Sequence, residues 1–550
     1  MRRFTCALTL CTFALATSAC GRNEADGPPP SDEDTLRGDD DDVDDGDDDA
    51  PADDDQPACT TVAARPGTVI TTSGAVTGQK TDTTWSWKGV RYAEPPVGEL
   101  RWKPPVPASC VATEVFASAF GPTCPQLSDG TVIGNEDCLT LNVWAREDAH
   151  DAPVLFFVHG GGNAQGTASD PLYDGHELAT RTGAVVVTIA YRLGALGYFT
   201  HRGLDAESTH AVSGNYGILD QQAALRWVQA NVAAFGGSPT HVLLFGESAG
   251  GQNTLVHIAS PLSAGLFHAA IVESGGVYRT TIEDAQAAMQ ELVAAVDCDD
   301  AIDEVACMRG RTVDSIVGVP SAIGPLEGEG MRYGPVVDGY VLPMNAADAL
   351  ASGTHNHVPL VIGTNAEETS RMVAAVETPE QYAAAVRAQY GLTLGNQLLA
   401  IYPAADYPSP RYALVRLTTD VIWTCPARSL ALAAATHQSE PVYRYYFTWH
   451  GPGIGGAIVG ATHGIELPFV FREFEAFGYS PTPDDLVLSE ATQRYWTRLA
   501  GGGDVNGPGD ITWPRYDTSD PYLTFGEDIT AAAGLRSEQC DAVDALAASL

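Results

Sequence analysis

The stretch 241–250 constrains the fold more than any other part of this 550-residue chain. An apolar run at 242–245 is typical of a buried strand, and it leads directly into Gly-Glu-Ser-Ala-Gly at 246–250. A helix-compatible segment, 251–259, follows. A strand that turns into a helix within a few residues crowds its backbone, and the two glycines of the motif remove the Cβ atoms that would collide. The pattern predicts a strained turn that exposes Ser248 at the start of a helix.

The predicted turn would place Ser248 where a helix favours negative charge. The free amides and the positive dipole end of the following helix would point at the serine oxygen. The motif is weak evidence by itself, because 56 glycines in the chain make such a sequence expected by chance roughly once in every two or three such chains. A glycine-rich turn with an incidental serine is the alternative, so the partners of the serine decide between the two.

A second glycine-rich segment follows another apolar run. Residues 154–158 are typical of a strand, and His159 follows with three glycines at 160–162. Glycines at the end of a strand let bare backbone amides approach a substrate oxygen, as in an oxyanion loop. The alternative is a flexible loop in which His159 is only a local hydrogen-bond partner. The position of the triplet directly after a strand favours the first interpretation.

The order of the predicted elements indicates the fold class. A continuous apolar strand at 185–190 precedes a helical pattern at 216–232, and the strand of the serine turn comes next. Further strands are predicted at 266–272 and 357–362, between alanine-rich helical stretches. Apolar runs without alternation are typical of strands that are buried on both faces. The chain is therefore predicted to have an α/β fold with a central, mostly parallel sheet flanked by helices.

A serine nucleophile needs a base, usually histidine, which is itself oriented by a carboxylate. The acid is expected just after a strand, because the carboxyl ends of parallel strands line the site. The segment 361–369 is a strand followed by a turn, and it offers Glu367 and Glu368. The pattern alone does not choose between these two neighbours.

Only three histidines lie downstream of that turn: His437, His450 and His463. His437 lies in a polar stretch after an alanine-rich helix and is expected to be exposed. His450 ends an apolar strand, so a place in the core or in a loop suits it. His463 lies on a glycine-rich loop between small residues, which suits a base that must reach the serine. Physical reasoning therefore favours His463 over His450.

The start of the chain has the composition of an export signal. Two arginines and the apolar stretch 4–16 predict a signal peptide over residues 1–19. The small residues ahead of Cys20 are similar to a bacterial lipoprotein cleavage and acylation site, so we expect an exported protein with a lipid on Cys20. Ordinary cleavage that releases a secreted product is the alternative.

An acidic, low-complexity stretch follows Cys20. Residues 21–58 hold 17 Asp or Glu against two Arg. Such a run repels itself and cannot bury apolar surface, so 20–58 is predicted to be an extended, disordered tether and 59–550 the globular domain. The Asp run at 39–42 lacks the spacing of a calcium loop, which favours a solvated spacer. The formal net charge of −40 argues against nucleic acid as a partner.

The eleven cysteines also indicate export. Cys6, Cys11 and Cys20 lie in or next to the predicted signal peptide, which leaves an even set of eight. None of the eight stands in a Cys-x-x-Cys pair, which disfavours a zinc site. Structural disulfides formed in an oxidising compartment are the expected use.

These motifs together resemble those of the type-B carboxylesterases, a family that includes cholinesterases and some fungal lipases. The resemblance runs from about Val69 to the C-terminus. The segments that carry it are Glu-Asp-Cys-Leu-Thr-Leu-Asn at 136–142, His-Gly-Gly-Gly at 159–162, Tyr-Arg-Leu-Gly at 191–194, Gly-Asn-Tyr-Gly-Ile-Leu-Asp-Gln at 214–221, Phe-Gly-Gly-Ser-Pro at 235–239, Phe-Gly-Glu-Ser-Ala-Gly-Gly at 245–251 and Trp-Pro at 513–514. It implies the α/β-hydrolase fold, with 59–550 as a carboxylesterase catalytic domain.

The resemblance also implies a role for individual residues. Ser248 would be the nucleophile, Glu368 the acid and His463 the base. Ser274 matches a buried serine that supports the acid in the family, although a serine that merely starts a helix would look the same. No metal and no organic cofactor are implied.

Backbone donors and disulfides follow from the same resemblance. The amides of Gly161, Gly162 and Ala249 would form an oxyanion hole. The implied cysteine pairs are Cys124–Cys138, Cys298–Cys307 and Cys425–Cys540, which leaves Cys59 for Cys110.

The resulting hypothesis is an exported serine esterase that acts on small or medium carboxylic esters. A catalytically silent adhesion or binding protein and a lipase of the same fold are the alternatives. The loop 125–137 is short and holds no aromatic residue, which disfavours a lipase lid and a choline site. Asn163 stands where the family usually has a bulky aromatic residue, so a wetter pocket wall is expected there. A membrane surface would be a partner only through a lipid on Cys20.

Overall fold

The computed structural model describes residues 62, 65–322, 326, 331–452, 456 and 459–549. The predicted signal peptide and tether, with Cys20, lie outside the described residues, as does Cys59. What the sequence predicts for them stays a prediction. Cys110 is disulfide-bonded, and the partner implied for it is Cys59. Among the helices of the described ranges, none is long and apolar enough to cross a membrane.

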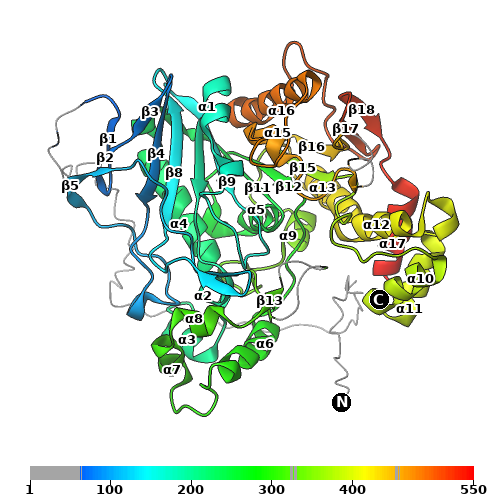
Figure 1. The fold of residues 1–550 in the computed structure, drawn as a ribbon, viewed down its shortest axis with the longest axis horizontal. Helices are drawn as coiled ribbons and strands as arrows, with labels where there is room; N and C mark the ends of the chain where they lie inside the picture. Colours follow the sequence, from blue (N-terminus) through cyan, green and yellow to red (C-terminus); the bar gives the residue numbers. More distant parts are fainter. Residues whose placement is uncertain are drawn as a thin grey trace, which may run out of the picture.

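One eleven-stranded sheet organises the described residues, with the strand order β18-β17-β16-β15-β12-β11-β9-β10-β8-β4-β3 (Figure 1). The strands are β3 (Gln79–Thr81), β4 (Thr84–Arg91), β8 (Thr140–Arg146), β9 (Ala152–Val158), β10 (Val185–Ile189), β11 (Gly237–Glu247), β12 (Ala269–Glu273), β15 (Leu360–Asn365), β16 (Val442–Phe447), β17 (Pro521–Phe525) and β18 (Thr530–Ala533). From β10 to β17 neighbouring strands are parallel, whereas the pairs at both ends are antiparallel. The predicted α/β fold with a central, mostly parallel sheet is confirmed.

Smaller sheets and many helices surround this sheet. The small sheets are formed by β1 (Thr68–Thr71), β2 (Gly74–Thr77) and β5 (Val111–Phe116), by β6 (Gln126–Ser128) and β7 (Thr131–Ile133), and by β13 (Ser321–Ala322) and β14 (Met331–Arg332). The α-helices are α1 (His176–Thr182), α2 (Gly194–Tyr198), α3 (Arg202–Glu207), α4 (Tyr216–Asn231), α5 (Ala249–Ala259), α6 (Ile282–Ala295), α7 (Glu304–Gly310), α8 (Val313–Val317), α9 (Ala346–Ser352), α10 (Pro379–Tyr390), α11 (Leu392–Ile401), α12 (Pro410–Thr419), α13 (Cys425–His437), α15 (Leu467–Phe471), α16 (Pro483–Gly502) and α17 (Ser537–Ala547).

Helices cover both faces of the sheet because side chains along each strand alternate between two cores. In β9, Val154, Phe156 and Val158 enter one core, whereas Leu155 and Phe157 enter the other. The first core is completed by α4, α5 and α13, and the second by α1, α15 and α16. In Figure 1 the second group lies along the upper side of the sheet.

The carboxyl ends of the central strands form one edge, and this edge fixes where a site can lie. Val158 at the end of β9 is paired with Gly246 of β11, Glu247 with Glu273 of β12, and Glu273 with Gly363 of β15. The segments that follow these strands therefore start side by side. In open α/β sheets this edge is where ligands bind.

The predicted elements differ from the observed ones mainly at their ends. The helix expected at 216–232 is α4, and the strand expected at 185–190 is β10. The strands expected at 266–272 and 357–362 begin and end about three residues or fewer later, as β12 and β15. The reason is register, because each strand extends as far as its neighbours offer backbone partners, and hydropathy does not encode that.

Three disulfides join described cysteines: Cys124–Cys138, Cys298–Cys307 and Cys425–Cys540. These are the pairs that the resemblance implies. Their sequence separations differ widely, at 14, 9 and 115 residues. Cys425–Cys540 ties the start of α13 to α17, near the end of the described chain.

We predict that the long disulfide loop stabilises the fold more than the short one. In the chain-entropy model a loop of 115 residues stabilises by about 5 kcal/mol and a loop of 9 residues by about 2.5 kcal/mol. The double variant Cys425→Ala/Cys540→Ala should therefore lose about twice the free energy of unfolding that Cys298→Ala/Cys307→Ala loses. Guanidinium denaturation of the two variants measures this.

The same denaturation series in excess reductant is the control, since the parent protein then lacks both crosslinks and the differences should largely vanish. Equal losses for the two variants under oxidising conditions would contradict the loop-length argument.

Candidate active site

Ser248 occupies a strained turn between β11 and α5. Its backbone has φ 57° and ψ −120°, a conformation that residues other than glycine rarely adopt. The Ser248 N–H donates to the carbonyl oxygen of Glu273 at 3.0 Å, so the turn is tied to the end of β12. A Cβ atom on Gly246 or Gly250 would collide with the carbonyl oxygen of Val158. The predicted need for glycine on both sides of Ser248 is confirmed, and the serine itself is partly exposed.

His463 lies beside this turn and is held by Glu368. Its Nδ1 is 2.6 Å from Oε2 of Glu368, and its backbone N–H donates to the Glu368 carbonyl oxygen at 3.2 Å. On the other side of the ring, Nε2 is 3.2 Å from Oε1 of Glu247, the residue before Ser248. The Ser248 hydroxyl makes no hydrogen bond to another described residue.

Glu368 is completely buried, and its carboxylate has three hydrogen-bond partners among the described residues. Besides His463, its Oε1 accepts hydrogen bonds from the Ser274 hydroxyl at 2.6 Å and from the Asn365 N–H at 2.7 Å. These donors stand at the ends of β12 and β15, so the carboxylate is fixed from two strands. Ser274 thus lies where the resemblance places it, against the acid.

The other candidates for the acid and the base, Glu367, His450 and His437, do not join this pair. Glu367 accepts hydrogen bonds from the Tyr412 hydroxyl at 3.0 Å and from the Ala461 N–H at 2.9 Å, and not from the His463 ring. His450 and His437 are both exposed at the surface. The structure therefore brings Glu368 and His463 together and leaves the other three residues apart from them.

Three further buried carboxyl groups lie in this region, and sequence reasoning missed them: Glu247 and Glu466, which interact with His463, and Glu273, which interacts with Glu247. Burial raises the pKa of Glu247 to about 7, that of Glu273 to about 8, and that of Glu466 well above its usual range. Glu273 Oε1 accepts from the Trp496 indole N–H at 2.8 Å, and Glu466 Oε2 accepts from the Asn365 amide at 2.5 Å. Glu247 and Glu273 directly precede Ser248 and Ser274 in the chain, and Glu466 follows His463 by three residues. This proximity in sequence was the available signal.

The environment of His463 favours its charged form. Burial lowers the pKa of the imidazole, but the carboxylates of Glu247 and Glu368 outweigh burial, so the pKa is raised. Trp423 also contacts the ring, with 5.3 Å between the ring centroids, and its indole N–H donates to the Ser274 carbonyl oxygen at 3.1 Å. Trp423 lies in a π-helical turn, η6 (Asp420–Thr424), a feature that is frequent at functional sites.

The glycine loop after β9 packs directly against the serine turn. Gly161 and Gly162 have φ values of 99° and 63°, and a Cβ on Gly160 would lie 2.8 Å from the Glu247 carbonyl oxygen and 3.0 Å from the Ser248 Cβ. Within the described chain the amides of Gly161 and Gly162 donate no hydrogen bond. Free backbone amides beside a serine are the donors that an oxyanion needs.

His159 has a local role in this loop. It is buried, its Nδ1 lies 2.9 Å from the Gly160 carbonyl oxygen, and its ring stacks on that of Tyr191 with centroids 4.5 Å apart. Burial lowers the pKa of His159 to about 4, so the ring is neutral at pH 7. The Tyr191 hydroxyl donates to the His159 carbonyl oxygen at 2.8 Å and anchors the start of the loop.

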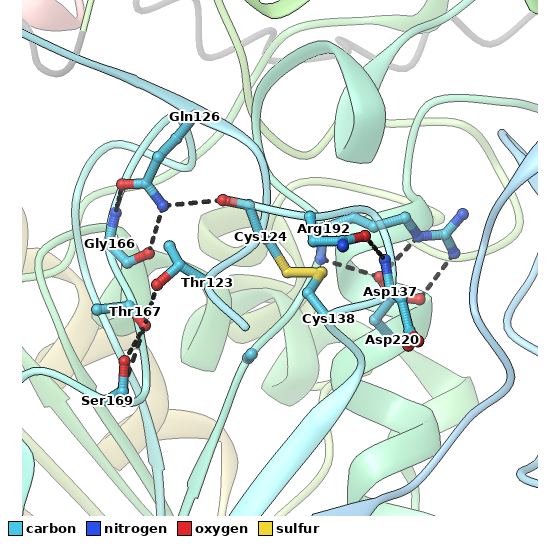
Figure 2. The surroundings of a disulfide bond; sticks show 12 residues. Thr123, Cys124, Gln126, Asp137, Cys138, Gly166, Thr167, Ser169, Arg192 and Asp220 are labelled. Carbon is cyan, nitrogen blue, oxygen red and sulfur yellow. Dashed lines mark hydrogen bonds and ion pairs between the residues drawn. A yellow bond between two sulfur atoms is a disulfide. The ribbon is translucent and has the colours of Figure 1, made fainter. Parts of the chain in front are cut away.

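Figure 2 shows how the end of this loop is held by the β6–β7 hairpin, which the Cys124–Cys138 disulfide closes. The Gln126 amide donates to the Gly166 carbonyl oxygen at 2.8 Å, and the Gly166 N–H donates to Gln126 Oε1 at 2.9 Å. The Thr123 hydroxyl donates to that of Thr167 at 3.2 Å. The hairpin is therefore attached to the glycine loop by side chains, and it does not stand away from it.

The expectation for Asn163 was wrong. The side chain is completely buried and does not line a wetted pocket wall. Its amide is hydrogen-bonded to Asn253 and to the hydroxyls of Tyr198 and Tyr278. Local pattern could not predict this burial, because the three partners come from segments that are distant along the chain.

Comparison with known proteins shows similarity to esterases along most of the chain. The model of the carboxylesterase family matches residues 65–543. Fumonisin B1 esterase of Sphingopyxis macrogoltabida is 34% identical over 84% of this chain and 87% of its own length. Para-nitrobenzyl esterase of Bacillus subtilis is 33% identical over 86% of this chain and 97% of its own length. A solved structure of a PNB esterase superposes with a TM-score of 0.75 and is 32% identical, covering 86% of this chain and 99% of that one.

We predict that Glu247 contributes to the raised pKa of His463. Its negative charge favours the imidazolium, so the neutral amide in Glu247→Gln should lower the pKa of His463 by about one to two units. The neutral ring then persists to lower pH. NMR titration of ring-labelled histidine, with the His463 signal identified by its loss in His463→Ala, measures the midpoint.

Glu367→Gln is the matched control, because Glu367 bonds to Tyr412 and Ala461 and is not among the charges that raise the pKa of His463. It should leave the midpoint unchanged. An unchanged midpoint in Glu247→Gln would mean that Glu247 is not a charged neighbour of the ring.

Proposed function

The chain belongs to the carboxylesterase family and is a carboxylic ester hydrolase, and from this premise we propose that it acts through an acyl-enzyme on Ser248. The observation that carries the proposal is the pairing of His463 with the fully buried Glu368, at 2.6 Å, beside the serine turn. A neutral histidine whose Nδ1–H is held by a carboxylate presents Nε2 as a base.

In the proposed reaction the Ser248 hydroxyl oxygen attacks the carbonyl carbon of the ester, and Nε2 of His463 accepts the hydroxyl proton. Glu368 keeps the imidazole in one tautomer and stabilises the imidazolium that forms. The alcohol then leaves with the proton from His463. Water repeats the sequence on the acyl-enzyme, which releases the carboxylic acid and regenerates the serine.

The carbonyl oxygen carries a negative charge in each tetrahedral intermediate, and we propose the amides of Gly161, Gly162 and Ala249 as its donors. Gly161 and Gly162 adjoin the serine turn, and Ala249 is the first residue of α5, where backbone amides have no partner within the helix. Each donor is expected to contribute on the order of 10²-fold to the rate.

We predict that Ser248→Ala abolishes esterase activity without loss of folding, because it removes one hydroxyl from a partly exposed turn. Glu368→Gln and His463→Ala should each lower kcat by about 10⁴-fold, since the base is then absent or held in the wrong tautomer. Hydrolysis of p-nitrophenyl butyrate by the purified variants measures this, with circular dichroism as the check on folding.

Glu367→Gln and His450→Ala are the controls, because one stands next to the acid and the other is the rejected base. Both should keep nearly full activity. Turnover retained by Ser248→Ala would refute the acyl-enzyme proposal. A large loss of kcat in Glu367→Gln with none in Glu368→Gln would mean that Glu367 is the acid.

We propose small or medium neutral esters as substrates. The β6–β7 hairpin is short, its residues 125–137 include no aromatic side chain for a choline headgroup, and Gln126 holds it down on the glycine loop. Two relatives are named as esterases, fumonisin B1 esterase and para-nitrobenzyl esterase. A lipase would need a larger apolar lid than this hairpin offers.

The substrate prediction concerns acyl length and charge. Acetyl and butyryl p-nitrophenyl esters should be hydrolysed with kcat/KM well above that of the palmitoyl ester, and acetylthiocholine should be slow. A series of p-nitrophenyl esters of rising acyl length measures the first point, and a choline ester compared with its uncharged isostere measures the second. Faster hydrolysis of the choline ester would contradict the prediction and demand an aromatic cage elsewhere.

Three disulfides are typical of proteins from oxidising compartments, so the chain is assigned to an extracellular or exported location. Beyond this we propose that Cys20 carries a lipid and that the acidic stretch 20–58 holds the enzyme away from a membrane surface. The sequence around Cys20 is the support for this proposal.

Mass spectrometry of the mature N-terminus tests the lipid proposal. A first residue Cys20 carrying acyl chains is the expected result, and Cys20→Ser should release the protein from the membrane fraction. An unmodified N-terminus at another residue would mean ordinary secretion.

A further inference from the structure

The side chain of Asn163 uses its whole hydrogen-bonding capacity inside the protein. Its amide nitrogen donates to the Tyr278 hydroxyl at 2.7 Å and to Asn253 Oδ1 at 3.2 Å. Its amide oxygen accepts from the Tyr198 hydroxyl at 3.0 Å and from the Asn253 amide at 2.9 Å. Two donors and two acceptor sites are all that an asparagine side chain offers. Asn163 and Asn253 are completely buried, and Tyr198 nearly so.

The network connects the two parts of the proposed oxyanion hole. Asn163 directly follows Gly162, and its φ of 55° is one that asparagine tolerates better than most residues. Asn253 lies on α5, one helical turn after Ala249, whose amide is the third proposed donor. The reciprocal pair of hydrogen bonds between the two amides therefore spans from the glycine loop to the helix of the nucleophile.

The backbone of Asn163 is fixed as well. Its carbonyl oxygen accepts from the Gly194 N–H at 2.7 Å, at the start of α2, and α2 also carries Tyr198. The residue is thus held by α2, by α5 and by Tyr278 in the segment after β12. The position of Asn163 is therefore set by bonds to residues outside the glycine loop.

From this arrangement we infer that Asn163 and Asn253 are positioning residues that hold the oxyanion donors of the glycine loop at a fixed place relative to α5. The inference rests on the proposed function. An oxyanion hole stabilises only the tetrahedral state, and a donor misplaced by about 1 Å can cost about 10²-fold in rate. The pair should therefore act on kcat, with little effect on substrate binding.

Two variants test the inference. Asn253→Ala suits a helix, and Asn163→Gly keeps the positive φ accessible while removing the amide. Each should lower kcat by about tenfold, with KM within about twofold of the parent value. Active-site titration with diethyl p-nitrophenyl phosphate normalises the rates to correctly folded enzyme.

A second readout separates positioning from general stability. An alkyl trifluoromethyl ketone forms a tetrahedral adduct that carries an oxyanion, so its inhibition constant should rise by the same factor by which kcat/KM falls. The double variant should lose about as much kcat as the more strongly affected single variant and no more, because either change breaks the same pair of hydrogen bonds.

Asn231→Ala is the matched control. Asn231, the last residue of α4, is also a buried amide. It donates to the Trp227 carbonyl oxygen and the Thr72 hydroxyl, and it accepts from the Thr72 N–H. It should lower the melting temperature and leave kcat and the inhibition constant unchanged.

Three outcomes would overturn the inference: wild-type kcat and inhibition constant in both variants, equal changes in KM and inhibition constant, or additive effects in the double variant. Failure of the proposed function is distinguishable, since it would appear as activity retained by Ser248→Ala. If Ser248→Ala is inactive and the asparagine variants behave as the parent does, only the positioning role is wrong.

Discussion

The buried carboxylate of Glu368 is the interaction on which the rest of the site depends. A completely buried charge costs several kcal/mol unless donors surround it. Its donors are the Ser274 hydroxyl, the Asn365 N–H and the ring of His463. These come from the ends of two neighbouring parallel strands and from a loop almost a hundred residues further along the chain. Satisfying one carboxylate therefore brings together three segments that the sequence keeps apart, and it sets the orientation of the imidazole.

Glu273 and Glu466, two other carboxyl groups of this region, are buried with fewer donors than Glu368. Glu273 Oε2 and Glu466 Oε1 are buried with no hydrogen-bond partner among the described residues. Burial raises the pKa of both groups, to about 8 for Glu273. A proton on each is therefore the state that burial favours at neutral pH, and the carboxyl groups that contact the His463 ring are those of Glu368 and Glu247. The cluster thus combines one carboxylate that receives three donors with two carboxyl groups that receive one side-chain donor each, and burial favours the neutral form of these two.

The sequence predicts features that depend on local pattern, and it fails where distant segments choose. The strained turn at Ser248, the helix α4 and the parallel sheet follow from periodicity and from glycine spacing. The choice between Glu367 and Glu368 does not, because adjacent residues on one turn differ only in the direction in which they point. That direction is set by Tyr412 on one side and by His463 on the other, each more than forty residues away. The expectation for Asn163 was wrong for the same reason, since hydropathy marks its amide as polar and cannot show that Tyr198, Asn253 and Tyr278 bind it inside the protein.

Glycine lets the loop after β9 approach Ser248 closely. It also gives that loop more conformational freedom than other residues would, so the loop costs more entropy to order. The structure restricts this freedom from outside the loop. The Tyr191 hydroxyl fixes its start, the buried amide of Asn163 fixes its middle, and Gln126 fixes Gly166 at its end. None of these bonds uses the amides of Gly161 or Gly162, which stay free for a ligand. The entropy of ordering the loop is thus spent during folding, so that no reorganisation is needed when charge develops on a bound carbonyl oxygen. A disulfide-closed hairpin is consistent with this, because a crosslinked element can hold a glycine loop without itself being mobile.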